Sequence, residues 1–337
     1  MNDDRSFQHL SRNFIKKWQS GITEIEAFTS GSTGTPKRIL LPRRLMEESA
    51  LRSIRHFGLN ESSIVHLSLS PEYIAGKMCI VRALMAGCRL TTEDASSHPL
   101  TSADTPPEIT LLSAVGAQIP GMLELKAKGK LPHIKHLLFG GSPLALSLRH
   151  DALTLADNVW ESYGMTETAS HIALRRVCIA PEPFSALPDI YVSTDARGCL
   201  IIDMPTAGRI VTNDLARLVD DKHFFILGRA DNVLITGGLK VIPELVEQKL
   251  NPYLPEHAYY ITSQPHPKWG EQVILVMEDT QVNEECTIDA ADFMIAGESL
   301  YELSHRILEP HERPAKVYKT HAIPRTSSGK IIRTKRL

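Results

Sequence analysis

Apolar residues recur with two different periods along this chain, every third or fourth position in some stretches and every second position in others. The longer period predicts helices, over residues 1–25, 43–57, 75–85, from 144, after 243 and over 290–307. The shorter period and brief apolar runs predict strands, over residues 64–69, 134–139, 200–202, 209–211, 224–227, 258–262, 272–277 and 317–323. Because the two kinds of element alternate, the pattern predicts an α/β fold.

Two glycine pairs interrupt this pattern. Gly140–Gly141 ends the apolar run 134–139 ahead of a predicted helix, and α/β folds bind ligands at such strand ends. Gly237–Gly238 separates two short apolar runs and predicts a β-hairpin within 233–242. Residues 92–107 are rich in Ser, Thr, Asp and Pro, so we expect a mobile loop there.

The length of the chain predicts more than one domain. At 337 residues it exceeds what one ordinary hydrophobic core holds. From residue 243 the pattern becomes a helix–strand unit of normal domain size. We therefore expect a large domain of layered α/β sheets over 1–229, a hinge at 230–232, and a small mobile α/β domain over 233–337.

Composition narrows the possible partners. The 37 basic and 39 acidic residues nearly cancel, which argues against a protein that holds nucleic acid through a broad basic field. No window approaches the roughly 18 uninterrupted apolar residues of a membrane-spanning helix, and the polar start lacks the apolar core of a signal peptide. The five cysteines are scattered without a C-x-x-C pair, as expected of thiols in a reducing cytoplasm.

The densest polar segment is a run of hydroxyls and glycines followed by Lys37. It comprises Thr29, Ser30, Gly31, Ser32, Thr33 and Gly34. Its glycines let successive N–H groups face one concavity that suits an anion, although the spacing is not that of a Walker loop. A flexible linker is the alternative, but the apolar residues on either side predict a tight turn between two strands.

Three further segments complete a pattern. They are Ser162–Thr168 (SYGMTET), Gly228–Asp231 (GRAD) and Pro324–Lys330 (PRTSSGK). The four segments, in this order, resemble the adenylate-forming superfamily of acyl-CoA synthetases, luciferases and peptide-synthetase adenylation domains, over residues 28–335. Within it the chain is most similar to the 2-succinylbenzoate–CoA ligase family of menaquinone biosynthesis.

The resemblance implies a reaction in two halves, with ATP, Mg²⁺ and CoA. The run from Thr29 to Lys37 would hold the β- and γ-phosphates by donors aimed at developing charge. Thr166 would contact the α-phosphate and Glu167 would bind Mg²⁺, unless Glu167 is an ordinary solvated acid. Lys330 would enter the site for adenylation, unless it is a solvated lysine of a basic tail.

The remaining nucleotide contacts are implied in the same way. They fall on Gly140, Gly141, Ser162, Tyr163, Gly164, Met165, Asp214 and Arg229. Tyr163 would stack on the adenine, with Gly140–Gly141 close to it, although two glycines after a strand also suit a plain turn. Asp214 and Arg229 would reach the ribose, although a surface salt bridge is the commonest fate of such residues.

The resemblance also assigns roles to the second domain. Asp231 occupies the hinge position, where a plain turn residue is the alternative. Gly237 and Gly238 would line the pantetheine channel of CoA as well as form a hairpin turn, and Lys240 would assist.

The acid substrate is implied by what surrounds its site. Tyr73 stands where the family often has a histidine as an aromatic gate. No aspartate nearby would hold an ammonium, which argues against an amino acid. For an aromatic acid with a second carboxylate, the candidate cations on the pocket wall are Lys77, Arg82 and His171.

Several alternatives stay open. The acid could be another aryl or acyl acid, the thiol acceptor could belong to a carrier protein, or the chain could be a nucleotide-binding scaffold without turnover. The family usually has a longer segment before the phosphate loop, so we expect other residues or a partner to cover the first sheet. Either a monomer or a homodimer is compatible with the sequence.

Overall fold

A computed structural model describes residues 7–28, 37–144, 146–254, 258–282, 284–326, 331–334 and 337. The chain forms two compact units, and each is described by itself. The first comprises Met1–Val192, Ile202–Ile210 and Val219–Phe224, and the second comprises Ser193–Ile201, Val211–Leu218 and Phe225–Leu337. The hinge at 230–232 and its mobility stay predictions.

The first unit is built on a mixed sheet. The strands of that sheet in this unit are β3 (Ile64–Leu67), β4 (Arg89–Thr92), β5 (Glu108–Ala114), β6 (His133–Phe139), β7 (Asn158–Met165), β8 (Ser170–Arg176) and β9 (Phe184–Ala186). Strands β1 (Glu24–Phe28) and β2 (Arg38–Pro42) form a separate two-stranded sheet. Neighbouring strands run in the order β9-β8-β7-β6-β5-β3-β4, parallel from β4 to β7 and antiparallel from β7 to β9. Strands β10 (Tyr191–Thr194), β11 (Cys199–Met204), β12 (Gly208–Leu218) and β13 (His223–Arg229) contribute residues to both units.

The described residues of this unit form five helices. They are α1 (Phe7–Gln19), α2 (Arg43–Phe57), α3 (Ile74–Ala86), α4 (Ile119–Ala127) and α5 (Leu146–Leu153), with short 3-10 turns η1 (Gly116–Gln118) and η2 (Thr166–Thr168). Helices α3, α4 and α5 each connect two parallel strands of the sheet. The predicted α/β class is confirmed, and the carboxyl ends of the parallel strands meet at one edge of the sheet. Among the described residues, every helix is too short or too polar to cross a bilayer.

The first hairpin connects the ends of the hydroxyl-rich run. Strands β1 and β2 are antiparallel and pair Phe28 with Arg38. This confirms the prediction that two strands flank the run. The predicted phosphate-binding positions Thr29, Ser30, Gly31, Ser32, Thr33 and Gly34 lie outside the described residues.

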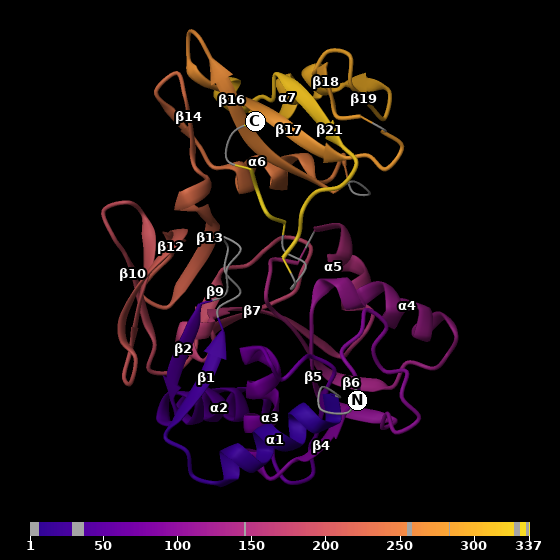
Figure 1. Cartoon of the computed structure of the whole chain (residues 1–337), viewed down its shortest axis with the longest axis vertical. Helices are drawn as coiled ribbons and strands as arrows, with labels where there is room; N and C mark the ends of the chain where they lie inside the picture. Colours follow the sequence, from indigo (N-terminus) through magenta and orange to yellow (C-terminus); the bar gives the residue numbers. More distant parts are fainter. Residues whose placement is uncertain are drawn as a thin grey trace. The chain divides into compact units, whose positions relative to one another are not determined.

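Helix α1 packs on α3, as does α2 (Figure 1). It buries Phe14 and Trp18. It ends at Gln19, before the expected residue 25, because Gly21 adopts a φ of 79° and β1 follows at Glu24. The amphipathic pattern of 43–57 predicts Leu51 on the buried face of α2, but Leu51 is exposed, since neighbouring positions on the helix face the core instead.

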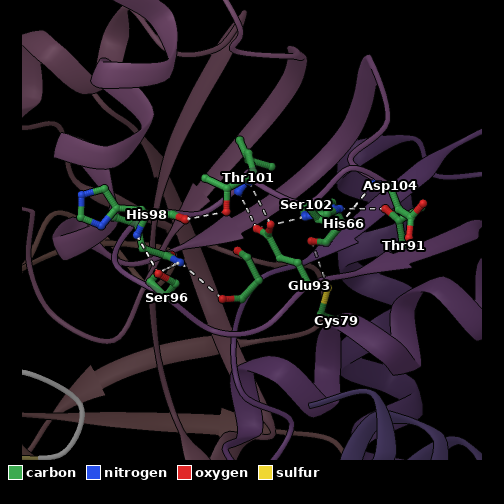
Figure 2. A network of polar contacts seen from close by, with 12 residues as sticks. His66, Cys79, Thr91, Glu93, Ser96, His98, Thr101, Ser102 and Asp104 are labelled. Carbon is green, nitrogen blue, oxygen red and sulfur yellow. Dashed lines mark hydrogen bonds and ion pairs between the residues drawn. The ribbon is translucent and has the colours of Figure 1, made fainter. Parts of the chain in front are cut away.

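The segment 93–107 lacks helices and strands, as predicted, and a buried carboxylate organises it (Figure 2). Glu93 accepts hydrogen bonds from the backbone N–H of Leu100 (2.6 Å) and Thr101 (3.2 Å). Its Oε1 lies 3.3 Å from Nε2 of buried His66. These contacts hold Leu100 at a φ of 65°, and the donors lower the pKa of Glu93 against the opposing effect of burial.

The second unit is a smaller α/β body. Its elements after β13 are η3 (Ala230–Asn232), β14 (Leu234–Thr236), β15 (Leu239–Val241), α6 (Pro243–Leu250), β16 (Tyr259–His266), β17 (Gly270–Glu278), β18 (Cys286–Asp289), β19 (Met294–Ile295), β20 (Glu298–Ser299), α7 (Leu300–Ile307), η4 (Pro310–Glu312) and β21 (Lys316–Thr320). The main sheet has the order β16-β17-β21-β18 (Figure 1). Most of its buried apolar side chains form one core with those of α6 and α7, and Tyr260, Val276 and Ile323 form a smaller cluster.

The predicted helix over 290–307 is wrong in its first half. Ala296 and Gly297 have φ of 49° and 95°, and they turn the chain between β19 and β20. Ser299 then caps α7 by accepting from the Glu302 N–H, and the Glu302 carboxylate accepts from Ser299 in return. The capping box therefore starts the helix at residue 300.

Candidate functional site

The SYGMTET segment forms a bulged turn between β7 and β8. Their pairing register shifts between Tyr163 and Gly164, and a Cβ on Gly164 would lie 2.3 Å from the carbonyl oxygen of Ser170. Only glycine fits there without moving backbone. The turn continues as η2, in which Thr166 is buried and Glu167 is exposed.

The side chains of this turn connect it to the start of the hydroxyl-rich run. The Thr166 hydroxyl donates to the carbonyl oxygen of Phe28 at 3.4 Å. Residues 138 positions apart in the sequence are thereby joined at the point where β1 ends. Lys37 lies at the other end of the run and is exposed.

The backbone after Glu167 is bent sharply. Ala169 and Ser170 have φ of 51° and 88°, conformations that cost a non-glycine residue free energy. The buried Ser49 hydroxyl on α2 donates to the carbonyl oxygen of Ala169 at 2.8 Å. The bend places Glu167 at the apex of the turn, and packing against α2 holds it there.

Glu167 has the properties expected of a magnesium ligand. Its carboxylate is exposed, and no described residue pairs with it. The described residues contain no cluster of three or more acidic, histidine or cysteine side chains that could hold a metal by themselves. One carboxylate supplemented by phosphate oxygens and water is how proteins usually bind Mg²⁺, so the turn fits the ion. Bound there, Mg²⁺ would neutralise charge on the phosphates.

The Gly140–Gly141 pair packs against the same strand. The Ser162 hydroxyl donates to the Phe139 carbonyl at 2.9 Å, and a Cβ on Gly140 would lie 2.7 Å from that hydroxyl oxygen. Gly141 has a φ of 89°. Packing and backbone conformation explain both glycines, and their role beside adenine stays a prediction.

Tyr163 lies in an aromatic cluster. Its ring centroid is 5.9 Å from that of Phe184 and 5.4 Å from that of Phe224. The side chain is half-buried, so part of the ring stays accessible. The role of Tyr163 in stacking on adenine stays a prediction.

Arg82 and His171, two candidate cations, share one buried network. Nη2 of Arg82 donates to Ser170 Oγ (3.1 Å) and to Nδ1 of His171 (3.3 Å). Nε2 of His171 lies 2.9 Å from the Ser53 hydroxyl. Burial is the largest cause that holds the pKa of His171 well below its usual range, and the positive charge of Arg82 is the next. His171 is therefore a neutral acceptor, and Arg82 is the cation of the pair.

No described carboxylate pairs with Arg82. The side chain is 1% exposed, and its Nε–H has no described partner. Burial lowers the pKa of Arg82 to about 10, so the guanidinium remains charged near neutral pH. A buried cation without a counter-charge is costly and typical of a ligand site.

Lys77 and Tyr73 lie at the start of α3. The Lys77 ammonium donates to the carbonyl oxygen of Glu72 at 2.6 Å and lies 6.0 Å from the centre of the Phe14 ring. Burial lowers the pKa of Lys77 to about 8. Its contacts connect α3 with α1. Tyr73 is 38% exposed, and its gate role stays a prediction.

In the second unit, Arg229 joins two predicted site residues. Its Nη1 donates to Asp214 at 2.9 Å and its Nη2 to Asp231 at 3.2 Å. Burial alone would lower the pKa of Arg229, but the two carboxylates raise it overall. The structure thus brings Asp214, Arg229 and Asp231 together as one ion-pair network. Their ribose and hinge roles stay predictions.

The Gly237–Gly238 hairpin is confirmed. Thr236 pairs with Leu239 across a two-residue turn, and the glycines have φ of 55° and 84°. Positive φ at both positions is typical of a type I′ turn, for which a Gly-Gly pair is one of the favoured sequences. Lys240 is exposed on the hairpin. Lys330 lies outside the described residues, and the CoA roles stay predictions.

Sequence reasoning missed two buried polar residues that hold the site. Ser49 supports the bend after Glu167, and Glu161 lies inside β7 with 2% of its side chain exposed. A carboxylate within an apolar strand was the available signal for Glu161. A serine on an amphipathic helix gives no comparable signal.

Three comparisons with known proteins bear on the family of this chain. The profile of the family described as AMP-binding enzyme matches residues 27–228. A curated 2-succinylbenzoate–CoA ligase of Listeria monocytogenes is 22% identical over 348 residues, covering 95% of this chain and 71% of the relative.

Two solved structures show the same fold. An acyl-CoA synthetase (AMP-forming)/AMP-acid ligase II-like protein from Dyadobacter fermentans is 28% identical, with a TM-score of 0.62, covering 98% of this chain and 93% of that one. The o-succinylbenzoate CoA synthetase of Bacillus subtilis, in complex with its acyl-adenylate intermediate, is 22% identical, with a TM-score of 0.75, covering 91% and 67%. Because the family profile spans more than half of the residues, this chain belongs to the AMP-binding enzyme family, within the adenylate-forming superfamily.

Proposed function

We propose that this chain is an ATP-dependent 2-succinylbenzoate–CoA ligase of menaquinone biosynthesis. In the first half-reaction a substrate carboxylate oxygen bonds to the α-phosphorus of ATP, and pyrophosphate leaves. In the second half-reaction the thiol sulfur of CoA bonds to the activated carbonyl carbon. The carbon–oxygen bond to AMP then breaks, and the thiol loses its proton.

The observation that carries this proposal is the bulged turn at Thr166–Glu167. It presents an exposed carboxylate that pairs with no residue in the described part of the chain, and it contacts the Phe28 carbonyl, where the hydroxyl-rich run begins. Such an arrangement supports joint binding of phosphates and a divalent cation. A scaffold without turnover has no need of Lys330, because simple ATP binding does not require that lysine.

The buried Arg82 guanidinium supports an acid with two carboxylates. One carboxylate of 2-succinylbenzoate is activated, and the other needs a counter-charge. Arg82 offers a charged donor whose described neighbours are neutral hydroxyl and imidazole groups. Pairing with a substrate carboxylate would compensate its desolvation.

The residues of the second unit complete the proposal. Asp214 and Arg229 would orient the ribose, and their mutual ion pair would keep both side chains in place. Gly237 and Gly238 would admit the pantetheine chain, and Lys330 would stabilise charge during adenylation. Asp231 would absorb a domain rotation.

The identity of the substrate acid is the part of the proposal that another result would most readily change. The ligases named for 2-succinylbenzoate are 22% identical, and the name of the Dyadobacter protein specifies no acid. A ligase for another aryl or acyl acid would share the turn and differ in the pocket around Arg82.

Mass spectrometry of reactions with ATP, Mg²⁺ and 2-succinylbenzoate, with and without CoA, tests the proposal. We expect succinylbenzoyl-AMP without CoA and the CoA thioester with it. Benzoates, fatty acids and a carrier-protein thiol run in parallel. Turnover with another acid or only with the carrier would replace that substrate, and ATP binding without any adenylate would favour a scaffold.

We further infer a cytoplasmic enzyme, a monomer or homodimer, that binds no nucleic acid. All five cysteines are free thiols, and the net charge is −2. Size-exclusion chromatography with light scattering measures the oligomeric state.

A further inference from the structure

Glu161 is a buried carboxylate beside the predicted adenine site, and both of its oxygens accept hydrogen bonds. Its Oε1 accepts from the backbone N–H of Leu144 at 3.0 Å. Its Oε2 accepts from Arg149 Nη2 at 2.8 Å and from Arg175 Nε at 2.9 Å. Glu161 and Arg149 are almost fully buried, and Arg175 nearly so.

These contacts connect two segments that both belong to the predicted base site. Leu144 ends the loop that begins with Gly140–Gly141, so its N–H bond fixes the far end of that loop. Tyr163 lies two residues beyond Glu161 on β7, and alternate residues of a strand share a face. Pairing of β6 with β7 already fixes the start of the glycine loop, and Glu161 fixes its Leu144 end to the strand that carries Tyr163.

A second path runs through Arg175. Its guanidinium carbon lies 4.2 Å from the centre of the Phe184 ring, and Phe184 contacts the ring of Tyr163. The guanidinium is thus clamped between the Glu161 carboxylate and an aromatic face. Movement of Arg175 would release the ring that supports Tyr163.

The charges of Glu161, Arg149 and Arg175 explain why a substitution of Glu161 would disturb their arrangement. Two guanidiniums face one carboxylate, and burial lowers the pKa of Arg175 although Glu161 opposes the shift. Apolar residues of similar volume often stabilise a core at least as well as buried ions do. The hydrogen bonds of Glu161 with Leu144 and Arg175 are directional, so they fix the relative positions of these residues, which an apolar side chain could not do.

We propose that Glu161 is a positioning residue that holds the Gly140–Gly141 loop and Tyr163 in the arrangement that binds the adenine base. This inference rests on the proposed function, because it presumes that the two segments contact the nucleotide. Glu161 acts through Leu144 and Arg175 and touches no substrate itself.

The test compares two buried carboxylates. Glu161→Gln removes the charge at nearly constant volume, and Glu93→Gln does the same in the network of Figure 2, at the edge of the sheet formed by β3 and β4. AMP affinity is measured by titration calorimetry, well below each melting temperature. We expect both variants to lose stability but only Glu161→Gln to bind AMP about tenfold more weakly or worse.

The outcomes separate the two proposals. Failure of the wild-type chain to bind AMP would overturn the proposed function. Wild-type binding with equal AMP affinity in both variants would overturn the positioning role.

A second variant covers the case in which Glu161→Gln fails to fold. Arg175→Lys keeps the charge but loses the planar fork and the stacking on Phe184. We expect the KM for ATP to rise severalfold and the kcat to change less, because base binding weakens while the phosphate turn is intact. A fall in kcat at constant KM would contradict the inference.

Discussion

Replacing Gly164 by alanine tests whether the bulge between β7 and β8 shapes the active turn. A Cβ at this position would lie 2.3 Å from the carbonyl oxygen of Ser170 and 2.5 Å from Cα of His171. Both are backbone atoms, so no side-chain rotation relieves the contact. The strands must separate, or the turn must change its register.

The size of the effect follows from these distances. Ordinary contact begins at 3.4 Å, so the two backbones must move apart by about 1.1 Å. Forcing an extra carbon into packed structure costs about 1–3 kcal/mol when side chains adjust. Because backbone must adjust here, we expect Gly164→Ala to lower the free energy of unfolding by about 3 kcal/mol.

The adenylation rate of Gly164→Ala should fall together with its stability. Thr166 and Glu167 follow Gly164 directly, and a displacement of about 1 Å is enough to reduce a rate by about 100-fold. Chemical denaturation measures the stability, and quenched-flow detection of acyl-AMP measures the adenylation rate.

A matched substitution separates sterics from backbone strain. Gly129 has a φ of 65° and open space around its Cα, so Gly129→Ala carries only the left-handed penalty of about 1–2 kcal/mol and should leave adenylation unchanged. If Gly164→Ala were no more destabilising than Gly129→Ala and adenylated at the wild-type rate, the steric reasoning would be refuted.

The remaining predictions concern charge and the two half-reactions. Lys330→Ala should reduce acyl-AMP formation by orders of magnitude and spare thioester formation from pre-made adenylate. Gly238→Ala should instead reduce thioester formation and spare acyl-AMP formation. If either variant lost both activities equally, the two residues would not have separate roles. Glu167→Gln should raise the Mg²⁺ concentration for half-maximal adenylation about tenfold with little change in melting temperature, because the carboxylate is exposed. Arg82→Met should raise the KM for 2-succinylbenzoate at least tenfold and the KM for benzoate far less, since benzoate lacks the second carboxylate; equal increases would remove Arg82 from acid selection. Lys77→Met should be about 2 kcal/mol more stable than the wild type at pH 7. The substitution removes the desolvation cost of the charged ammonium, which the lowered pKa of about 8 reflects, and it loses the hydrogen bond to Glu72, which offsets part of the gain.

The pH dependence of that last difference has a definite sign. Below pH 8 both folded and unfolded chains carry protonated Lys77, and the folded state bears the desolvation cost. Between about 8 and the ordinary value of 10.5 only the unfolded chain stays protonated, so wild-type stability rises with pH. The advantage of Lys77→Met should therefore shrink across this window in urea titrations, and a constant advantage would rule out desolvation as its cause.

The control for Glu167→Gln is Glu61→Gln, an exposed carboxylate on a surface loop. It should leave the Mg²⁺ dependence unchanged. An equal shift in both variants would mean that bulk charge, and not the turn, controls the effect.

Local patterns were enough to predict much of this fold. The helix over 43–57 begins and ends where its amphipathic pattern predicts, and the hairpin at Gly237–Gly238 follows from two glycines between apolar runs. Both depend on residues that are neighbours in the sequence. The first half of the predicted helix over 290–307 failed for a local reason too, because Gly297 and Ser299 carry a turn and a cap within an apolar pattern.

Motifs in the sequence also identified the family and nominated Thr166, Glu167 and Arg82. Tertiary structure alone decided how these residues are held. It joined Thr166 to Phe28, left Arg82 without a carboxylate among the described residues, and placed Glu161 between two arginines. The physical reason is that charge compensation, burial and close backbone approach depend on which distant segments meet, and a linear pattern specifies only the period of each segment.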